Sequence, residues 1–252
     1  MEFLKSNQID VHFDFTTDTP YYWDGFWNHK CGLGSGKNDP DIKSKTLQRY
    51  HQLLWSRLLP NGQFLDLTAG AGKNYLTWND FRFGSDSITA SFRYKRYSFM
   101  LEQVQVVSDY RTFVENYLRK MYTIGGMIIF PKRPGGINQS RGINPFIKDR
   151  WDLTLECIRR YYNHETSPLY DTLLRDKKFF DLFVDFEGYV NFFFLQDCVS
   201  TNYTAVTFWL GNGDFTRVPL PQTVCDYLQW IENMLVFVER RNMRIQKFIT
   251  NK

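Results

Sequence analysis

The stretch that decides the fold is INQSRGINPFIKDRWDLTLECIRRYYNHE, residues 137–165. Up to Gly142 it is rich in Gly, Asn and Ser, a composition typical of a loop. From about Lys148 or Asp149, apolar residues recur at helical spacing on two sides, which predicts a largely buried helix. Just before the stretch, YTIGGMIIFP (122–131) predicts a buried strand. Polar loops between a strand and a helix often carry binding residues, so the stretch holds the best candidate for a polar site.

The predicted helix carries charged residues on one side. At about 100° per residue, five of them fall within roughly a quarter turn. They are Asp149, Asp152, Glu156, Arg159 and Arg160. One interpretation is structural: Glu156 pairs with the two arginines at helical spacing. The other is functional: acids and arginines line a pocket, in which the acids hold a cation and the arginines a phosphate.

On the functional interpretation, the pocket also includes Asn138 and Arg141 from the loop. The candidate catalytic residues are then Asn138, Arg141, Asp152, Glu156 and Arg159, and Arg160 is a candidate binding residue. The sequence predicts no metal ligands and does not indicate a cofactor.

Two arginines of the stretch are predicted to differ in role. Arg141 is followed by glycine in the loop, where its guanidinium could meet a carboxylate or phosphate in a bidentate manner. Arg150 falls on a side of the helix that is expected to be buried, where an unpaired charge would cost several kcal/mol. We therefore expect a buried acid beside Arg150, with Asp185 and Asp197 as candidates. Arg150 should matter for stability, and Arg141 for activity alone.

The whole pattern predicts a single α+β domain over residues 1–252. Hydrophobic residues make up 43% and charged residues 23%, as in globular proteins, and 18% aromatic residues predict a core of large flat side chains. We expect a mixed or antiparallel sheet mainly in residues 1–135 and a mainly helical part in 136–252. Strands are predicted near 11–15, within 75–92, and at 122–131 and 205–210, the last returning to the sheet. Helices are predicted at 44–59, 109–121 and 222–248, with two or three short ones within 167–197.

Basic residues point to a class of ligand. The formal net charge is +4, which permits nucleic-acid binding without requiring it. In FRYKRYSF (92–99), the candidate binding residues Arg93, Lys95 and Arg96 are interleaved with aromatic side chains, a pattern that can follow a phosphate backbone while stacking bases. An edge strand with a solvated basic face would give the same pattern. The preferred functional hypothesis is an intracellular enzyme or effector that acts on a nucleotide or nucleic acid.

Two alternatives come from other segments. Tyr21, Trp23 and Trp27 would form an apolar patch if they were exposed, which is typical of a non-catalytic module that binds a protein partner. FLDLTAGAGK (64–73) is similar to the first motif of S-adenosylmethionine-dependent methyltransferases. That site needs a helix directly after the glycine-rich turn, whereas the residues that follow alternate as strands do. This disfavours a methyltransferase.

The remaining signals concern compartment and chemistry. The cysteines at 31, 157, 198 and 225 lack metal-site spacing, which favours free thiols in a reducing compartment. The first residues lack the apolar core of a signal peptide, and acids interrupt the most apolar run, so we expect a cytoplasmic protein without a membrane span. His51 lies in the predicted helix 44–59, and we expect it to be hydrogen-bonded at the rim of the core.

Four segments together resemble a family of bacterial proteins of unknown function. They are TLQRYHQLLWSRLLPNG (46–62), YTIGGMIIFP (122–131), INQSRG with DRWDLTLECIRRYY (137–162), and the run from SPLYDTL to FFDLFVDFEGYVNFFFLQD (167–197). The resemblance covers most of the chain and implies a single domain. It carries no activity, substrate or cofactor, and FLDLTAGAG is not part of it.

Overall fold

The computed structural model describes residues 9–28, 38–70, 75–88, 109–217 and 220–251, and it has an α+β fold. One antiparallel sheet has the order β1-β2-β3-β4, with β1 at Thr68–Ala69, β2 at Leu76–Trp78, β3 at Phe81–Ser87 and β4 at Met127–Pro131. The register pairs Ser85 with Ile129 and Asp86 with Ile128. Every residue of β4 is buried, as its apolar sequence predicts. An antiparallel sheet in the N-terminal half and a helical C-terminal half are therefore confirmed.

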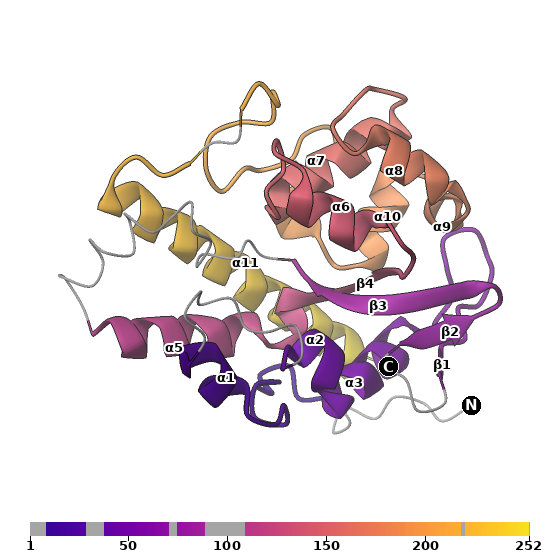
Figure 1. The fold of residues 1–252 in the computed structure, drawn as a ribbon. Helices are drawn as coiled ribbons and strands as arrows, with labels where there is room; N and C mark the ends of the chain where they lie inside the picture. Colours follow the sequence, from indigo (N-terminus) through magenta and orange to yellow (C-terminus); the bar gives the residue numbers. More distant parts are fainter. Residues whose placement is uncertain (1–8, 29–37, 71–74, 89–108, 218–219, 252) are drawn as a thin grey trace.

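Among the described residues, three helices precede the sheet and lie on one side of it (Figure 1): α1 (Tyr22–Asn28), α2 (Pro40–Lys43) and α3 (Lys45–Trp55). Ser44 ends α2 and begins α3, because its side chain accepts a hydrogen bond from the Leu47 N–H. The buried face of α3 includes Leu47, Leu54 and Trp55, so this helix forms part of the core, as its spacing predicts.

The other side of β3 and β4 carries the second group of helices (Figure 1). These are α6 (Ile137–Ile143), α7 (Trp151–Tyr162), α8 (Tyr170–Arg175), α9 (Lys177–Phe180) and α10 (Phe186–Phe192), with short 3-10 turns η3 (Asp181–Phe183) and η4 (Gln196–Cys198). Their core is aromatic: the rings of Phe179, Phe183, Tyr189 and Phe193 form a continuous series of tilted and edge-on contacts. The prediction of a core of large flat side chains is confirmed.

The long helix α11 (Val224–Thr250) belongs to the C-terminal half but packs against two elements of the N-terminal half. These are α5 (Tyr110–Met121) and the 3-10 turn η2 (Ile124–Gly126). Thr223 and Asp226 form a capping box at its start. Deep inside, the Arg241 guanidinium donates to the carbonyls of Gly125, Met127 and Phe193 at 2.8–2.9 Å, which fixes the start of β4 against the end of α10. Among the described helices, α11 included, none combines the length and apolar character needed to span a bilayer.

Two predicted strands are wrong. Residues 11–15 form turns, because the Asp10 and Asp14 carboxylates each accept the backbone N–H two residues on, at 2.9 Å. Residues 205–210 do not return to the sheet. Their β pairing among described residues is an isolated bridge between Val206 and Val199.

The stretch at residues 137–165 also differs from its prediction. Residues 137–143, expected to be a loop, form helix α6, which Gly136 precedes in an extended conformation. The next helix, α7, begins at Trp151, later than predicted, because Lys148 and Asp149 adopt positive φ angles of 46° and 64°. Asp149 is therefore not part of the helical strip of charges.

Candidate functional site

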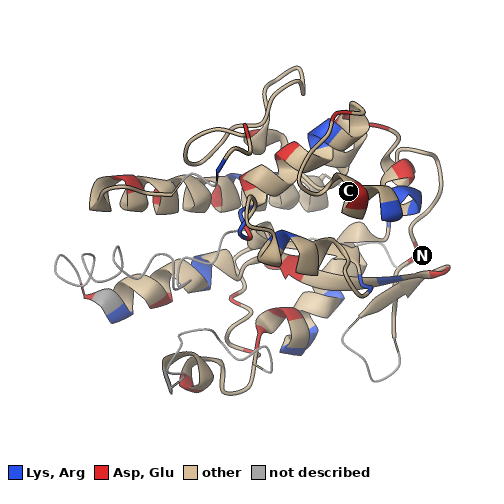
Figure 2. Ribbon diagram, turned by 45° about the horizontal axis from the view of Figure 1, so that its top comes forward, with Lys and Arg blue, Asp and Glu red and all other residues tan. Residues whose placement is uncertain are grey.

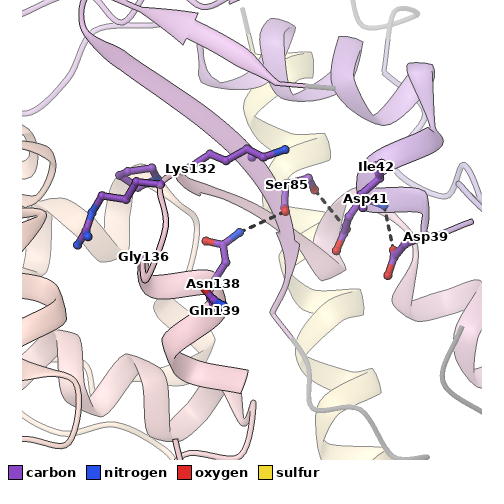
Figure 3. A pocket seen from close by; sticks show the side chains of 11 residues that line it. Asp39, Asp41, Ile42, Ser85, Lys132, Gly136, Asn138 and Gln139 are labelled. Atoms are coloured by element: carbon purple, nitrogen blue, oxygen red, sulfur yellow. Dashed lines mark hydrogen bonds between the residues drawn. The ribbon is translucent and has the colours of Figure 1, made fainter. Parts of the chain in front are cut away.

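A polar pocket lies where α2, β3 and the start of α6 meet, as Figure 3 shows. Its volume is about 240 Å³. Acids from α2 line one side, and the segment that follows β4 lines the other. The lining residues are Asp39, Asp41, Ile42, Gly84, Ser85, Pro131, Lys132, Arg133, Gly136, Asn138 and Gln139.

Local sequence fixes the two acids of α2. Asp39 is the N-cap of this helix, and its carboxylate accepts the Asp41 N–H at 3.1 Å. Pro40 occupies the first helical position, which suits its fixed φ and its missing N–H. Asp41 then meets β3, where the Ser85 hydroxyl donates to Asp41 Oδ1 at 3.3 Å (Figure 3).

The environment of these acids favours their protonated forms. Burial raises the pKa of Asp41 well above its usual range, and the nearby carboxylates of Asp39 and Asp86 raise it further. Burial likewise raises the pKa of Asp39, while the Asp41 N–H and the Tyr122 hydroxyl, 3.5 Å away, oppose the shift. The pocket therefore brings together two carboxyls that compete for one negative charge.

Basic residues stand across the pocket from the acids. The Lys132 stem packs over Gly84, where a β-carbon would approach it to 3.4 Å, and its side chain reaches toward Ser85 (Figure 3). Within the described part of the chain, Lys132 forms no salt bridge, and its ammonium lies 6.0 Å from the centre of the Tyr75 ring. Arg133 instead pairs with Asp176 at 2.5 Å. Lys132 is thus the cation that the pocket can offer to an anionic ligand.

Asn138, predicted as a site residue, lines this pocket. Its Nδ2 donates to the Ser85 carbonyl at 3.4 Å. Its Oδ1 is buried, and among the described residues it has no hydrogen-bond partner. An acceptor in this position is suited to a donor group on a ligand.

Arg141 lies on α6, three residues after Asn138, and is fully buried, so the prediction that it lies in a loop is wrong. Its role in activity stays a prediction. Its Nη1 lies 3.1 Å from the Asp86 carboxylate and 3.0 Å from that of Asp149. The guanidinium also donates to the carbonyl of Ser87 at 2.9 Å and to the Thr154 hydroxyl at 3.2 Å. The side chain therefore holds β3, α6 and the loop before α7 together.

The charged strip of α7 does not reach the pocket. Glu156 accepts from Arg159 and Arg160, each at 2.8 Å, which is the pairing that the structural interpretation of this strip predicts. Arg160 also donates to the Gly213 carbonyl at 2.9 Å. Asp152 is completely buried, and it accepts the Trp209 N–H at 2.9 Å. The structure separates Asp152, Glu156, Arg159 and Arg160 from Asn138 and the acids of α2.

Arg150 is buried and held by an acid, as predicted, but the partner is different. It forms an ion pair with Asp152, two residues along the chain, and donates to the Leu210 carbonyl at 2.7 Å. The acids expected in this role act elsewhere. Asp185 caps α10, and Asp197 pairs with Arg244.

The other predicted binding segments add little to the pocket. Arg93, Lys95 and Arg96 lie outside the described residues. Tyr21 is exposed, whereas Trp23 and Trp27 are half-buried and pack against the core. Arg119 and Arg111 lie over their rings at 4.8 and 5.3 Å.

Sequence reasoning missed the acids of α2, Ser85 and Lys132. Asp39-Pro40-Asp41 carries a helix-start signature, an N-cap acid followed by proline, which is a signal for a short helix at this place. The meeting of this segment with β3, some 45 residues later, has no local signal. Among the described residues, no group of three or more His, Cys, Asp or Glu side chains is arranged to hold a metal ion.

Comparison with known proteins places the chain in one family. The model of a family of unknown function, DUF6994, matches residues 9–245. The chain belongs to this family. The match includes every residue that lines the pocket. No curated protein and no solved structure matches the chain.

Beyond Gly70, the structure does not follow the methyltransferase pattern in the part it describes. Gly70 pairs with Tyr75, and β2 and β3 then form an antiparallel hairpin through Asn79, whose φ is 49°. The prediction of strands and turns in this region is confirmed.

Proposed function

We propose that the chain is an enzyme that acts on a small nucleotide-like ligand in the pocket between α2, β3 and α6. The observation that carries the proposal is the pair of carboxyls, Asp39 and Asp41, facing Lys132 across a cavity of about 240 Å³. In this proposal Lys132 binds a phosphate of the ligand, and the amides of Asn138 and Gln139 bind its polar edge.

Asp41 supplies the acid–base chemistry in this proposal. A carboxyl whose pKa is raised by burial keeps its proton to a higher pH than an ordinary aspartate and can donate that proton to a leaving group. In this proposal Asp39 carries the negative charge that the two carboxyls share, because the Asp41 N–H and the Tyr122 hydroxyl oppose the rise of its pKa, and it can accept a proton from a hydroxyl or a water molecule. Two carboxyls with different charge states are the usual requirement for proton transfer in both directions.

The pocket favours a single nucleotide unit over a nucleic-acid strand. Its volume of about 240 Å³ leaves room for one small ligand or part of one, and not for several nucleotides at once. Its acidic side would repel a continuous phosphate backbone. On the described helices, acidic and basic positions are interspersed (Figure 2), which gives little support to a long basic track.

The proposal includes a cytoplasmic location. Cys157, Cys198 and Cys225 are free thiols, and the first two are buried. Free thiols are usual in a reducing compartment. A protein-binding role for the aromatic N-terminal region has weaker support, because arginines cover Trp23 and Trp27.

Isothermal titration with nucleoside mono- and diphosphates, ribose 5-phosphate and a short single-stranded RNA tests the proposal. We expect at least one mononucleotide to bind and Lys132→Ala to weaken it about tenfold or more, since a charge-assisted hydrogen bond contributes about 1.5–3 kcal/mol. Lys178→Ala, an exposed lysine on α9, is the matched control and should bind as wild type does. Equal binding by the Lys132→Ala variant, or binding of RNA alone, would contradict the proposal.

A further inference from the structure

A series of hydrogen bonds connects the core to the pocket through four side chains. The Trp55 indole Nε1 donates to His51 Nδ1 at 2.9 Å, one helical turn away on α3. His51 Nε2 lies 3.0 Å from Ser85 Oγ on β3. The Ser85 hydroxyl in turn donates to Asp41 Oδ1 at 3.3 Å. His51 and Trp55 both lie on α3, whereas Ser85 lies on β3 and Asp41 on α2, so the series joins three elements.

The direction of these hydrogen bonds follows from the chemistry of the Trp55 indole. An indole N–H can donate but cannot accept, so the Nδ1 atom of His51 must carry a lone pair. The proton of a neutral His51 imidazole is therefore on Nε2, and it is donated to Ser85 Oγ. Ser85 has one proton of its own, and this proton points to Asp41.

We infer that His51 is a positioning residue: its neutral Nε2–H tautomer orients the Ser85 hydroxyl toward Asp41 Oδ1. Because Oδ1 is held as an acceptor, the proton that Asp41 gains or loses is carried on Oδ2. The inference deepens the proposed function, since it names the oxygen of Asp41 that would serve as the acid. The orientation of the three side chains can be tested without any ligand.

A histidine, a serine and an aspartate can together form the site of a nucleophilic serine. Here the hydrogen bonds between them run in the opposite direction. A serine nucleophile needs an unprotonated ring nitrogen to accept its proton. Here the lone pair of His51 faces Trp55, and the nitrogen facing Ser85 carries hydrogen. The acid contacts the serine and not the histidine. Ser85 is therefore a donor to Asp41 and is not activated for attack.

The surroundings of His51 and of Asp41, on either side of Ser85, agree with this arrangement. His51 is buried, which together with the nearby Arg241 lowers its pKa to about 3, so it stays neutral at ordinary pH. Asp41 faces the carboxyls of Asp39, Asp86 and Asp149, which favour its protonated form. A proton donor is thus held in place by a neutral histidine whose own charge does not change.

Nitrogen-15 NMR of the imidazoles tests the tautomer in the free protein. We expect His51 to show an unprotonated Nδ1 and a protonated Nε2 at every pH from about 5 to 8, without a titration step, in contrast to an exposed histidine of ordinary pKa near 6.5. A protonated Nδ1, or an imidazolium forming in this range, would overturn the inference. This result does not depend on ligand binding, so it separates the inference from the proposed function.

Carbon-13 NMR of the aspartate carboxyls tests the positioning role. Ser85→Ala should shift the Asp41 midpoint to higher pH, because the Ser85 hydrogen bond favours the carboxylate. His51→Ala should change the midpoint, and His51→Gln, which can still donate to Ser85, should restore it toward wild type. If the Asp41 titration midpoint were the same in all three variants as in wild type, the positioning role of His51 would be overturned.

A fluorophosphonate probe with mass spectrometry tests the competing role of Ser85. We expect no label on Ser85 in the wild-type protein. Labelling of Ser85 that His51→Gln abolishes would show an activated nucleophile and would overturn the inference.

Discussion

Arg141 joins Asp86 to Asp149 beneath the pocket: its Nη1 lies 3.1 Å from the first carboxylate and 3.0 Å from the second. The arginine is fully buried, and both acids are largely so. Asp86 follows Ser85 on β3, so this contact fixes the strand against α6 and the loop before α7. One guanidinium therefore connects three segments next to the pocket.

Arg141→Ala is expected to destabilise the protein by about 3–5 kcal/mol, because it leaves buried carboxylates without their cation. Urea unfolding measures the loss. Arg111→Ala is the control: that side chain is 70% exposed in its pair with Glu115, and its removal should cost no more than about 1 kcal/mol. Equal midpoints for the two variants would refute the scaffold role of Arg141.

Asp152→Ala is expected to be similarly severe, since it removes the ion pair between Asp152 and the buried Arg150 and also the acceptor of the Trp209 N–H. Asp185→Ala removes an N-cap and should cost about 1 kcal/mol. The comparison is made by thermal and urea unfolding of both variants. A larger loss for Asp185→Ala than for Asp152→Ala would mean that Arg150 depends on a different acid.

Local pattern predicted much of the fold, because it depends on the spacing of apolar residues. The buried strand at 127–131 and the helices that begin at Lys45, Tyr110 and Val224 follow from such spacing. The burial of Arg150 followed from a helical wheel. Its acidic partner did not, because Asp152 reaches it by the turn of the chain at the helix start and not by contact between distant helices.

The site was harder to predict, because its residues come from distant segments. Asn138 was found, since it lies just after a buried strand. Asp41 was not identified as a candidate, and its role depends on Ser85, 44 residues away. Arg141 was misplaced because glycines suggested a loop, whereas Ile137–Ile143 is helical and turns the guanidinium inward.

The acids of the pocket should make the protein less stable as pH rises. A carboxyl with a raised folded pKa binds more protons in the folded state than in the unfolded chain, so stability falls between the unfolded value near 3.9 and the raised folded value. Asp41→Asn should therefore raise the melting temperature above pH 7 and reduce its decline with pH. Melting curves at pH 5 to 9 give the comparison, and an unchanged slope would contradict the raised pKa of Asp41.

His51 should change the pH dependence of stability in the direction opposite to that of Asp41. Its folded pKa of about 3 lies below the unfolded value near 6.5, so the unfolded chain binds the extra proton. Stability should fall as pH drops below about 6.5, by up to about 1.4 kcal/mol per pH unit. His51→Gln should lose this acid-side decline, while His164→Gln, an exposed control, should keep it. The same decline in both variants would mean that His51 titrates normally.

Turnover by wild type and Asp41→Asn tests the central claim most directly. The mononucleotide that binds best in titration is incubated with each protein at pH 7, and products are followed by phosphorus and proton NMR. We predict that the variant binds the ligand within about threefold of wild type but forms product at least about 100-fold more slowly, as expected for loss of a general acid. Product formation by Asp41→Asn at the wild-type rate would contradict the assignment of this pocket as an acid–base site.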